Sequence, residues 1–235
     1  MAHKLTARLV YSASTRLNDS GFLFFSMESK VYNADCLEGM KQYPDKWFDL
    51  AVVDPPYGLG DKLSIGGTSH MKFCERYQNG EKWDNAIPTP EYFSELFRIS
   101  KNQIIWGGNY FALPPTRGFI VWDKKQPLVN FSAAEFAWTS FWVPSKIFSF
   151  SRSGGATDNN KIHPTQKPIS LYGFIYRNFL PTGGTVIDTH LGSGSNRIAA
   201  DKAGNIDFTA YEIDKDYFEA QEKRFKDYKA QGVLF

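Results

Sequence analysis

The stretch FDLAVVDPPY, at residues 48–57, decides the fold class of this chain. Its first six residues are apolar with one exception, which is typical of a strand that is buried on both faces of a parallel sheet. Two prolines then end the strand, because proline has no amide hydrogen to donate to a neighbouring strand. The stretch therefore predicts a buried strand whose carboxyl end carries Asp54 and Tyr57.

Apolar runs alternate with helix-forming segments on both sides of this stretch. Asp35 is followed three residues later by Glu38, which is the spacing of a helix-capping box, and Gly204 is placed to end another helix. We expect strands at residues 31–33, 48–53, 102–106, 118–122, 135–141, 146–150, 184–188 and 206–211, and helices at 35–43, 91–99, 169–180, 195–203 and 214–229. The alternation predicts an α/β fold with a largely parallel sheet.

The composition limits the class of protein. With 235 residues the chain has room for one large domain, or for a core with a small appendage. Its 27 Lys and Arg against 25 Asp and Glu leave a net charge of +2, which argues against a basic tail and against a disordered chain. Cys36 and Cys74 are too few for a disulfide framework, so we expect a reducing, cytoplasmic location. No apolar run approaches roughly 18 residues, so we expect no membrane span.

The first 27 residues differ from the rest of the chain. They carry three basic residues, one acid and several Ser and Thr, a composition that suits a transit-like segment, an arm on the fold or a leader before a start at Met27. We expect a poorly structured extension at 1–27, followed by a single domain at 28–235.

The tetrapeptide at 54–57 offers groups that suit an amine. Asp54 presents a carboxylate acceptor, and Pro55 presents a carbonyl whose direction is fixed by two locked φ angles. Two adjacent acceptors can take both hydrogens of an –NH₂ group, which favours a pyramidal nitrogen and frees its lone pair for attack on a methyl group. Tyr57 adds a face on which a planar base can stack. The alternative is a Pro-Pro turn with a capping Asp.

A second signal lies where a buried strand ends at Asp188 and a Gly-Ser-Gly turn follows at 192–194. Such a turn before a helix forms a nucleotide or cofactor cradle, and Glu212, 20 residues after Gly192, can bind ribose hydroxyls. The turn lacks the Gly-Lys-Ser/Thr ending of a phosphate loop, and Arg197 occupies the third-glycine position of a dinucleotide site. A nucleoside cofactor without phosphates, such as S-adenosylmethionine, fits best, and an ordinary tight turn remains the alternative.

Four segments resemble motifs of the DNA amino-methyltransferases, the enzymes that make N6-methyladenine or N4-methylcytosine. They are the segments at 33–37, 54–57, 163–168 and 188–195. The catalytic tetrapeptide precedes the cofactor loop, which is the circularly permuted β-class order, whereas RNA and protein-glutamine methyltransferases with similar tetrapeptides generally have the opposite order. The resemblance covers about residues 31–228.

The resemblance implies the S-adenosylmethionine-dependent methyltransferase fold, a mostly parallel, seven-stranded twisted sheet with helices on both faces. It implies that Asp54 and Pro55 hold the target amine and that Tyr57 stacks on the flipped base. The implied catalytic residues are Asp54, Pro55, Pro56 and Tyr57. The implied residues for S-adenosylmethionine are Asp35, Cys36, His163, Thr165, Lys167, Asp188, Gly192, Ser193, Gly194 and Glu212, and no metal is implied. Taken alone, Asp35 is equally a helix cap and Lys167 a surface lysine.

The chain departs from the family pattern in two places. Thr189-His190 replaces the usual Pro-Phe, which removes a large apolar side chain from the wall of the cofactor pocket and predicts weaker or altered cofactor binding. A separate target-recognition domain is scarcely present, so loops at about 58–85 and 123–162 must recognise DNA. Their basic residues, the candidates for phosphate contacts, are Lys62, His70, Lys72, Arg76, Lys124, Lys125, Lys146, Arg152 and Lys161.

The resulting hypothesis is methyl transfer to a flipped base of double-stranded DNA. Adenine N6 is favoured because Asp, rather than Ser, leads the tetrapeptide. An N4-cytosine enzyme, an RNA amino-methyltransferase and a catalytically silent DNA-binding relative remain alternatives. A homodimer and a separate restriction endonuclease are compatible with the family, and we expect no nuclease activity in the same chain because no nuclease segment is found.

Overall fold

The structure is a computed structural model, which describes residues 15–17, 23–25, 27–59, 87–125, 132–151, 162–163 and 165–231. Most of the expected loop at 58–85 and part of the loop at 123–162 lie outside these ranges. So do several residues named above, namely Lys62, His70, Lys72, Cys74, Arg76, Arg152 and Lys161, and residue 164 of the segment at 163–168.

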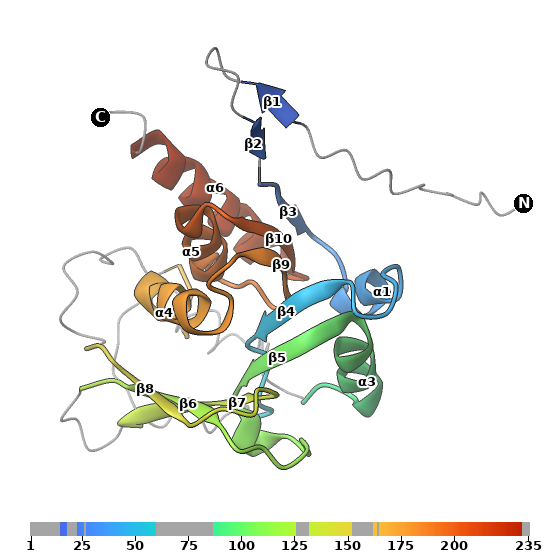
Figure 1. Cartoon of the computed structure of the whole chain (residues 1–235), viewed down its shortest axis with the longest axis vertical. Coiled ribbons are helices and arrows are strands. Elements are labelled where there is room, and N and C mark those ends of the chain that lie inside the picture. Colours follow the sequence, from blue (N-terminus) through green and yellow to red (C-terminus); the bar gives the residue numbers. More distant parts are fainter. Residues whose placement is uncertain are drawn as a thin grey trace, which may run out of the picture.

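An eight-stranded sheet forms the centre of the protein (Figure 1). The resemblance implies seven strands, and that number is wrong because β8 adds to the edge by pairing parallel to β6. The strands lie in the order β3, β10, β9, β4, β5, β7, β6, β8, and among them β7 alone runs antiparallel to its neighbours. Their bounds are β3 Ser29–Tyr32, β4 Phe48–Val53, β5 Ser100–Trp106, β6 Phe119–Asp123, β7 Ala134–Thr139, β8 Lys146–Ser149, β9 Gly184–Asp188 and β10 Ile206–Tyr211.

Helices cover both faces of the sheet, as expected. Helices α4 (Ile169–Phe179) and α5 (Ser195–Ala203) pack on one face, and α1 (Cys36–Met40) and α3 (Pro90–Ile99) pack on the other (Figure 1). Helix α6 (Lys215–Gln231) contacts α5. The expected α/β layering, with helices on both faces of the sheet, is confirmed.

The central strand β4 explains why its sequence is apolar without alternation. Leu50 and Val52 point into the hydrophobic cluster beneath α4 and α5, whereas Ala51 and Val53 point into the cluster beneath α1 and α3. All four are fully or almost fully buried. Since a buried leucine replaced by alanine costs about 2–5 kcal/mol, the packing on both faces holds the end of β4 in place.

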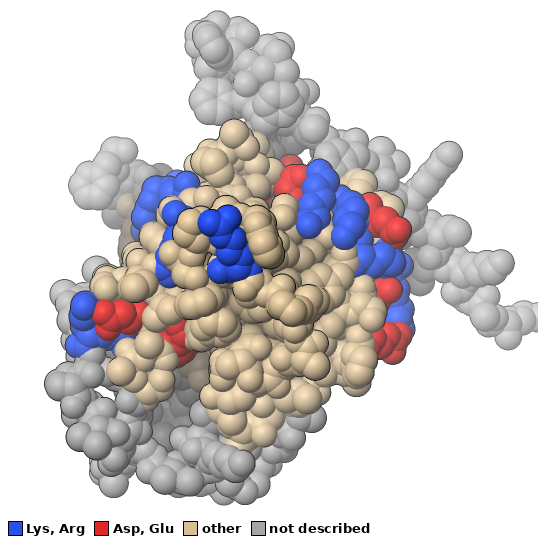
Figure 2. Space-filling model, turned by 60° about the horizontal axis from the view of Figure 1, so that its bottom comes forward, with Lys and Arg blue, Asp and Glu red and all other residues tan. Residues whose placement is uncertain are grey.

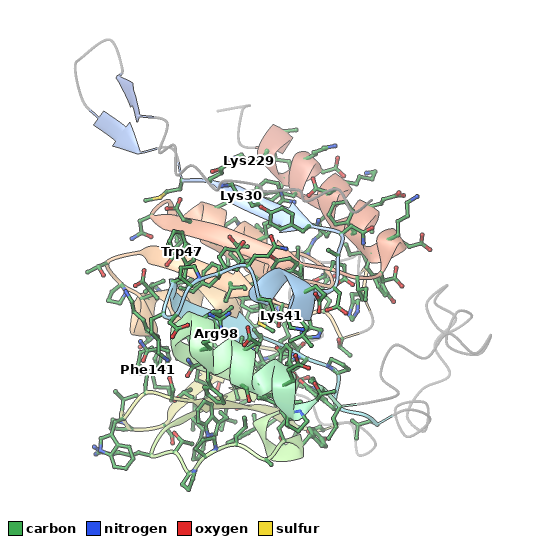
Figure 3. All side chains as sticks on the ribbon, turned by 90° about the vertical axis from the view of Figure 1, so that its right-hand side faces the viewer. Lys30, Lys41, Trp47, Arg98, Phe141 and Lys229 are labelled. Atoms are coloured by element: carbon green, nitrogen blue, oxygen red, sulfur yellow. The ribbon has the colours of Figure 1, made fainter. Side chains whose placement is uncertain are left out.

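One side chain ties α1 to α3 (Figure 3). Arg98, in the last turn of α3, donates to the carbonyl oxygens of Met40 and Tyr43, where α1 ends. It also forms ion pairs with Glu95 and Asp45 at 2.7 and 2.9 Å, and these carboxylates raise the pKa of the guanidinium. The link fixes α1 against the sheet.

The segment expected as an extension contains two short strands. β1 (Thr15–Leu17) and β2 (Leu23–Phe25) pair antiparallel in a sheet of their own, which is separate from the eight-stranded sheet. In the described parts of the chain, no helix combines the length and the apolar character that crossing a membrane requires.

Candidate active site

The expected site residues gather at one edge of the sheet. β4, β9 and β10 are neighbouring parallel strands, so their carboxyl ends lie side by side. Asp54 follows β4, Asp188 ends β9 and Glu212 follows β10. In open α/β sheets ligands bind outside this edge.

The Asp54 carboxylate has a partner on each oxygen. The Tyr57 hydroxyl donates to Oδ1 at 2.5 Å, and the Lys167 ammonium forms a short ion pair with Oδ2. The Asp54 side chain is about one-fifth exposed, and Pro55 beside it is buried. Burial, and then the charge of Asp54, raise the pKa of Tyr57, so its hydroxyl stays a donor at neutral pH. The carboxylate is therefore held in one orientation.

The Tyr57 ring lies against a glycine turn after β5. Gly107 has φ +67°, and a Cβ added there would lie 2.1 Å from Tyr57 Cε1. The ring stacks on Tyr110, with centroids 4.9 Å apart and planes 15° apart. Tyr110 belongs to the short 3₁₀ helix Gly108–Tyr110 and is 43% exposed. Tyr57 is therefore held beside Asp54, and the exposed Tyr110 ring stacks on it.

Lys167 contacts the Asp54 carboxylate. The resemblance implies that it closes the cofactor pocket; the residue is 3% exposed, and its ammonium also lies 3.2 Å from Glu135 Oε2. Burial lowers the pKa of this lysine, but the two carboxylates outweigh burial and raise it. Lys124, expected to contact DNA, is also buried and pairs with Glu135 Oε1 at 2.7 Å. Glu135 is a residue that the sequence analysis does not identify.

The glycine turn after β9 is closed by Glu212. Gly192 and Gly194 have φ of +51° and +74°, values that favour glycine. The Gly192 amide donates to Glu212 Oε2 at 2.8 Å, and the Asp214 amide donates to Oε1 at 3.0 Å. Burial raises the pKa of Glu212. The turn and the acid thus form one unit across two neighbouring strands.

Asp188 lies deep beneath this turn. It is 3% exposed and accepts hydrogen bonds from Asn196 Nδ2 at 2.8 Å and from the His190 amide at 3.1 Å. Burial raises the pKa of this carboxyl to about 7, because these two donors are neutral and compensate its charge only in part.

His163 covers the glycine turn from the other side. A Cβ at Gly192 would lie 3.5 Å from the imidazole, and the ring packs on Tyr217 with centroids 4.5 Å apart. Thr165 Oγ1 lies 3.1 Å from His163 Nδ1. Burial, and then the charge of Lys167, lower the pKa of His163 to about 4, so the ring is neutral at pH 7. The His163 ring therefore lies beside the turn, with Thr165 hydrogen-bonded to it.

Comparisons with known proteins bear on the family. A family model described as DNA methylase matches residues 137–223. The chain is 24% identical over 250 residues to the Type II methyltransferase M.HinfI of Haemophilus influenzae, which covers 85% of this chain and 68% of that relative. It is 25% identical over 224 residues to the Type II methyltransferase M2.MboI of Moraxella bovis, which covers 75% and 81%. These matches support the resemblance of the chain to the DNA amino-methyltransferases.

Solved structures share the fold of this chain. The M1.HpyAVI–SAM complex matches with a TM-score of 0.52 and 21% identity, over 83% of this chain and 98% of that one. The cytosine-N4-specific PvuII DNA methyltransferase matches with a TM-score of 0.58 and 16% identity, over 84% of this chain and 86% of that one. These matches confirm the S-adenosylmethionine-dependent methyltransferase fold.

The Thr189-His190 pair is packed against α3. Tyr92 Oη and Thr189 Oγ1 are hydrogen-bonded at 2.6 Å, and the His190 ring meets Tyr92 edge-on with centroids 5.5 Å apart. Burial lowers the pKa of His190 to about 4. The His190 ring is therefore uncharged at neutral pH and packs against an aromatic ring of α3.

Asp35, Ser193 and Arg197 have partners within the protein, and Cys36 is partly buried. Asp35 accepts from the Leu37 amide at 2.7 Å and so caps α1. Cys36 is half-buried, and burial raises its pKa to about 12. Ser193 Oγ lies 3.1 Å from Ser195 Oγ. Arg197 turns toward α6, where it pairs with Glu222 at 2.6 Å and lies over Phe225, so it does not face the glycine turn.

In the described parts of the chain, no group of three or more His, Cys, Asp and Glu side chains is arranged to hold a metal ion.

Proposed function

We propose that the protein transfers a methyl group from S-adenosylmethionine to the exocyclic amine of a base in double-stranded DNA, with adenine N6 as the acceptor. The observation that carries the proposal is the position of Asp54. Its carboxylate stands at the end of β4, fixed by Tyr57 and Lys167, on the edge that the glycine turn and Glu212 also occupy.

The residues near the glycine turn fit the cofactor. Glu212 has one carboxylate oxygen on each of two backbone amides, and each oxygen keeps a lone pair that can accept a ribose hydroxyl. Gly192 and Gly194 leave the turn without side chains, and the neutral His163 covers it. Asp188 would line the methionine end. When bound, S-adenosylmethionine would supply an electrophilic methyl group on a sulfonium centre.

The residues at the end of β4 would prepare the acceptor amine. The Asp54 carboxylate and the Pro55 carbonyl would each accept one N–H bond, which removes the delocalisation of the nitrogen lone pair into the ring. The same carboxylate would stabilise the positive charge that develops on the nitrogen, and the proton would leave afterwards toward Asp54 and solvent. Tyr57 and Pro56 would bound the base slot, with Tyr57 stacking on the base.

Adenine is proposed over cytosine because Asp leads the tetrapeptide in this chain. One structurally similar protein, the PvuII DNA methyltransferase, is cytosine-N4-specific. The base is therefore a point for direct measurement.

Contacts with DNA would come from groups around the site. The base must leave the duplex to reach Asp54, at a cost of a few kcal/mol. On the face in Figure 2, basic side chains lie in separate groups, several of them beside acidic ones. Lys125 pairs with Asp123, and Lys124 is buried, so Lys146 and residues outside the described ranges remain the stronger candidates for phosphate contacts. A homodimer and a separate restriction endonuclease are part of the proposal only through the family.

The test is methyl transfer from labelled S-adenosylmethionine to unmethylated duplex DNA, followed by nucleoside mass spectrometry, with an RNA pool in parallel. We expect N6-methyldeoxyadenosine. The Asp54→Ala variant should lose at least about 100-fold in kcat, as expected for removing a preorganised hydrogen-bonding group, while calorimetry shows cofactor binding unchanged. N4-methyldeoxycytidine would change the base, label in RNA alone would change the substrate, and an unimpaired Asp54→Ala variant would contradict the mechanism.

A further inference from the structure

A row of four side chains with alternating charge begins at Asp54 and follows the edge of the sheet. Its members are Asp54, Lys167, Glu135 and Lys124, and each contacts the next. We infer that Glu135, supported by Lys124, is a positioning residue that acts through Lys167 to hold the Asp54 carboxylate in its working orientation. This inference rests on the proposed function, because it assigns a role in the same methyl transfer.

The topology of the sheet places three members of this row at the same edge. Asp54 follows β4, and β5, β7 and β6 lie next to it in that order. Because β7 runs antiparallel to its neighbours, its beginning, and not its end, lies at the carboxyl edge, and Glu135 is its second residue. Lys124 directly follows β6 at the same edge. Neighbouring strands are about 4.8 Å apart, so the row of charges from β4 to β6 spans three strand spacings, or roughly 14 Å.

The ammonium group of each lysine lies over a tryptophan ring. Lys167 Nζ lies 5.2 Å from the centre of the Trp106 ring, and Lys124 Nζ lies 5.3 Å from that of Trp122. Trp106 and Trp122 are buried in the cluster beneath α4 and α5, and Glu135 pairs with Trp122 in register between β6 and β7. Each ammonium thus rests on an indole face and reaches sideways to carboxylates, a geometry that restricts a side chain with four rotatable bonds.

The charges balance only if Glu135 is present. Two ammonium groups and two carboxylates alternate, and both lysines are almost fully buried. Burial would raise the pKa of Glu135, but Lys167 and Lys124 outweigh burial and lower it, so the group is an anion. Without Glu135, two buried cations would face a single carboxylate. Breaking a buried pair in this way is costly, because it leaves an uncompensated charge.

This arrangement bears on the strength of Asp54 as an acceptor. Lys167 fixes Oδ2 and leaves Oδ1, with Tyr57, toward the proposed amine. If Lys167 had no second carboxylate, its whole charge would act on Asp54 and oppose the positive charge that develops on the amine nitrogen. Glu135 shares the ammonium and so preserves the negative potential at Asp54. Loss of Glu135 should therefore reduce the rate of the chemical step and leave cofactor affinity alone.

The experiment compares three variants of the full chain. Glu135→Gln removes one charge. The double variant Lys124→Met with Glu135→Leu removes a balanced pair, so that it folds even where the single change does not. Lys101→Met is the matched control, because it breaks an exposed ion pair with Asp49 at the opposite end of β5. For each we would measure kcat and KM on duplex DNA, cofactor affinity by calorimetry, and Tm.

We expect kcat to fall at least about tenfold in the Glu135→Gln and double variants, as for a small displacement of a reacting group, with KM and cofactor affinity within about twofold of the parent. The control should match the parent. The inference is overturned if the double variant keeps the parental kcat. It is also overturned if kcat, cofactor affinity and Tm all fall and KM rises, because that pattern indicates general structural damage. An inactive parent chain that binds cofactor would instead refute the proposed function, so the two failures can be told apart.

Discussion

Two carboxylates at neighbouring strand ends, Asp54 and Asp188, are held in different ways. Asp54 is paired with a buried lysine and a tyrosine hydroxyl. Asp188 is more deeply buried and is held by one side-chain amide and one backbone amide, both neutral. Glu212, the next acid along the edge, is also held by backbone amides.

The two regions differ in how far the protein itself compensates the carboxylate charge. On the Asp54 side the charges are balanced within the protein, so a neutral base can bind without leaving a charge unpaired. On the side of Asp188 and Glu212, burial raises both carboxyl pKa values, and neither acid has a cation among its described partners. That side gains the most from a ligand with hydroxyl groups or positive charge, which is the kind of ligand proposed for it.

The largest effect expected from this comparison is a dependence of stability on pH. The pKa of Asp188 is raised to about 7 in the folded chain, so its native state holds a proton that the unfolded state releases near pH 4. Its contribution to the free energy of unfolding should therefore be highest below pH 4 and fall as pH rises to 7. At 1.36 kcal/mol per pKa unit the fall is at most about 4 kcal/mol.

The measurement is urea unfolding between pH 4 and 8 for the parent and for Asp188→Asn. The variant lacks the titrating group, so its stability should fall less with pH. Parallel curves for the two proteins would show that Asp188 is compensated as well as Asp54 is.

The next effect comes from one substitution made in both regions, Gly107→Ala and Gly192→Ala. Both glycines have positive φ, so alanine costs about 1–2 kcal/mol of backbone strain at either position. At Gly107 the new Cβ would also overlap the Tyr57 ring, whereas at Gly192 the nearest atom is 3.5 Å away. We expect about a 100-fold loss of kcat for Gly107→Ala, because Tyr57 must move from Asp54, and a smaller effect on kcat for Gly192→Ala.

Steady-state kinetics with saturating cofactor would decide between these outcomes, and Tm would report the strain common to both variants. Equal losses of kcat would mean that backbone strain, and not the position of Tyr57, sets the effect.

The smallest effect concerns Glu212. Replacing it by Ala removes the acceptor for two amides and for the proposed ribose hydroxyls, and should weaken cofactor affinity by roughly 1.5–3 kcal/mol, or about 10- to 150-fold. Calorimetry with S-adenosylmethionine measures this loss, and Glu222→Ala on α6 is a control outside the turn. If both variants bind the cofactor as the parent does, Glu212 has no part in its recognition.

The fold followed from local patterns. Each expected strand and helix is confirmed within a few residues, because buried strands between glycines and prolines leave a clear sequence signal. Residue patterns indicated eight strands, including residues 146–150, while the family resemblance implied seven, and the structure has eight. The strand at residues 146–150 was therefore indicated by its own residues, whereas the number of strands implied by the resemblance left it out.

The site was less readable from the sequence. The acids and glycines at strand ends could be predicted, because parallel strands bring their carboxyl ends together. The contact between Lys167 and Asp54 spans 113 positions, and no periodicity reveals such a pair. The only sequence signal for Glu135 is that it is a lone acid in an aromatic strand. Its place at the site depends on the reversed direction of β7, which the sequence pattern does not specify.

The pairing of β3 with β10 has a consequence for how the chain is made. Asn33 bonds the carbonyl of Glu212 across 179 positions, whereas β4 and β5 are neighbours both along the chain and in the sheet. At synthesis rates of about 5–20 residues per second, the ribosome adds β10 roughly 10–35 s after β3. Throughout that interval β3 has no strand to pair with, and the wall that contains Glu212 is the last part of the proposed pocket to be translated.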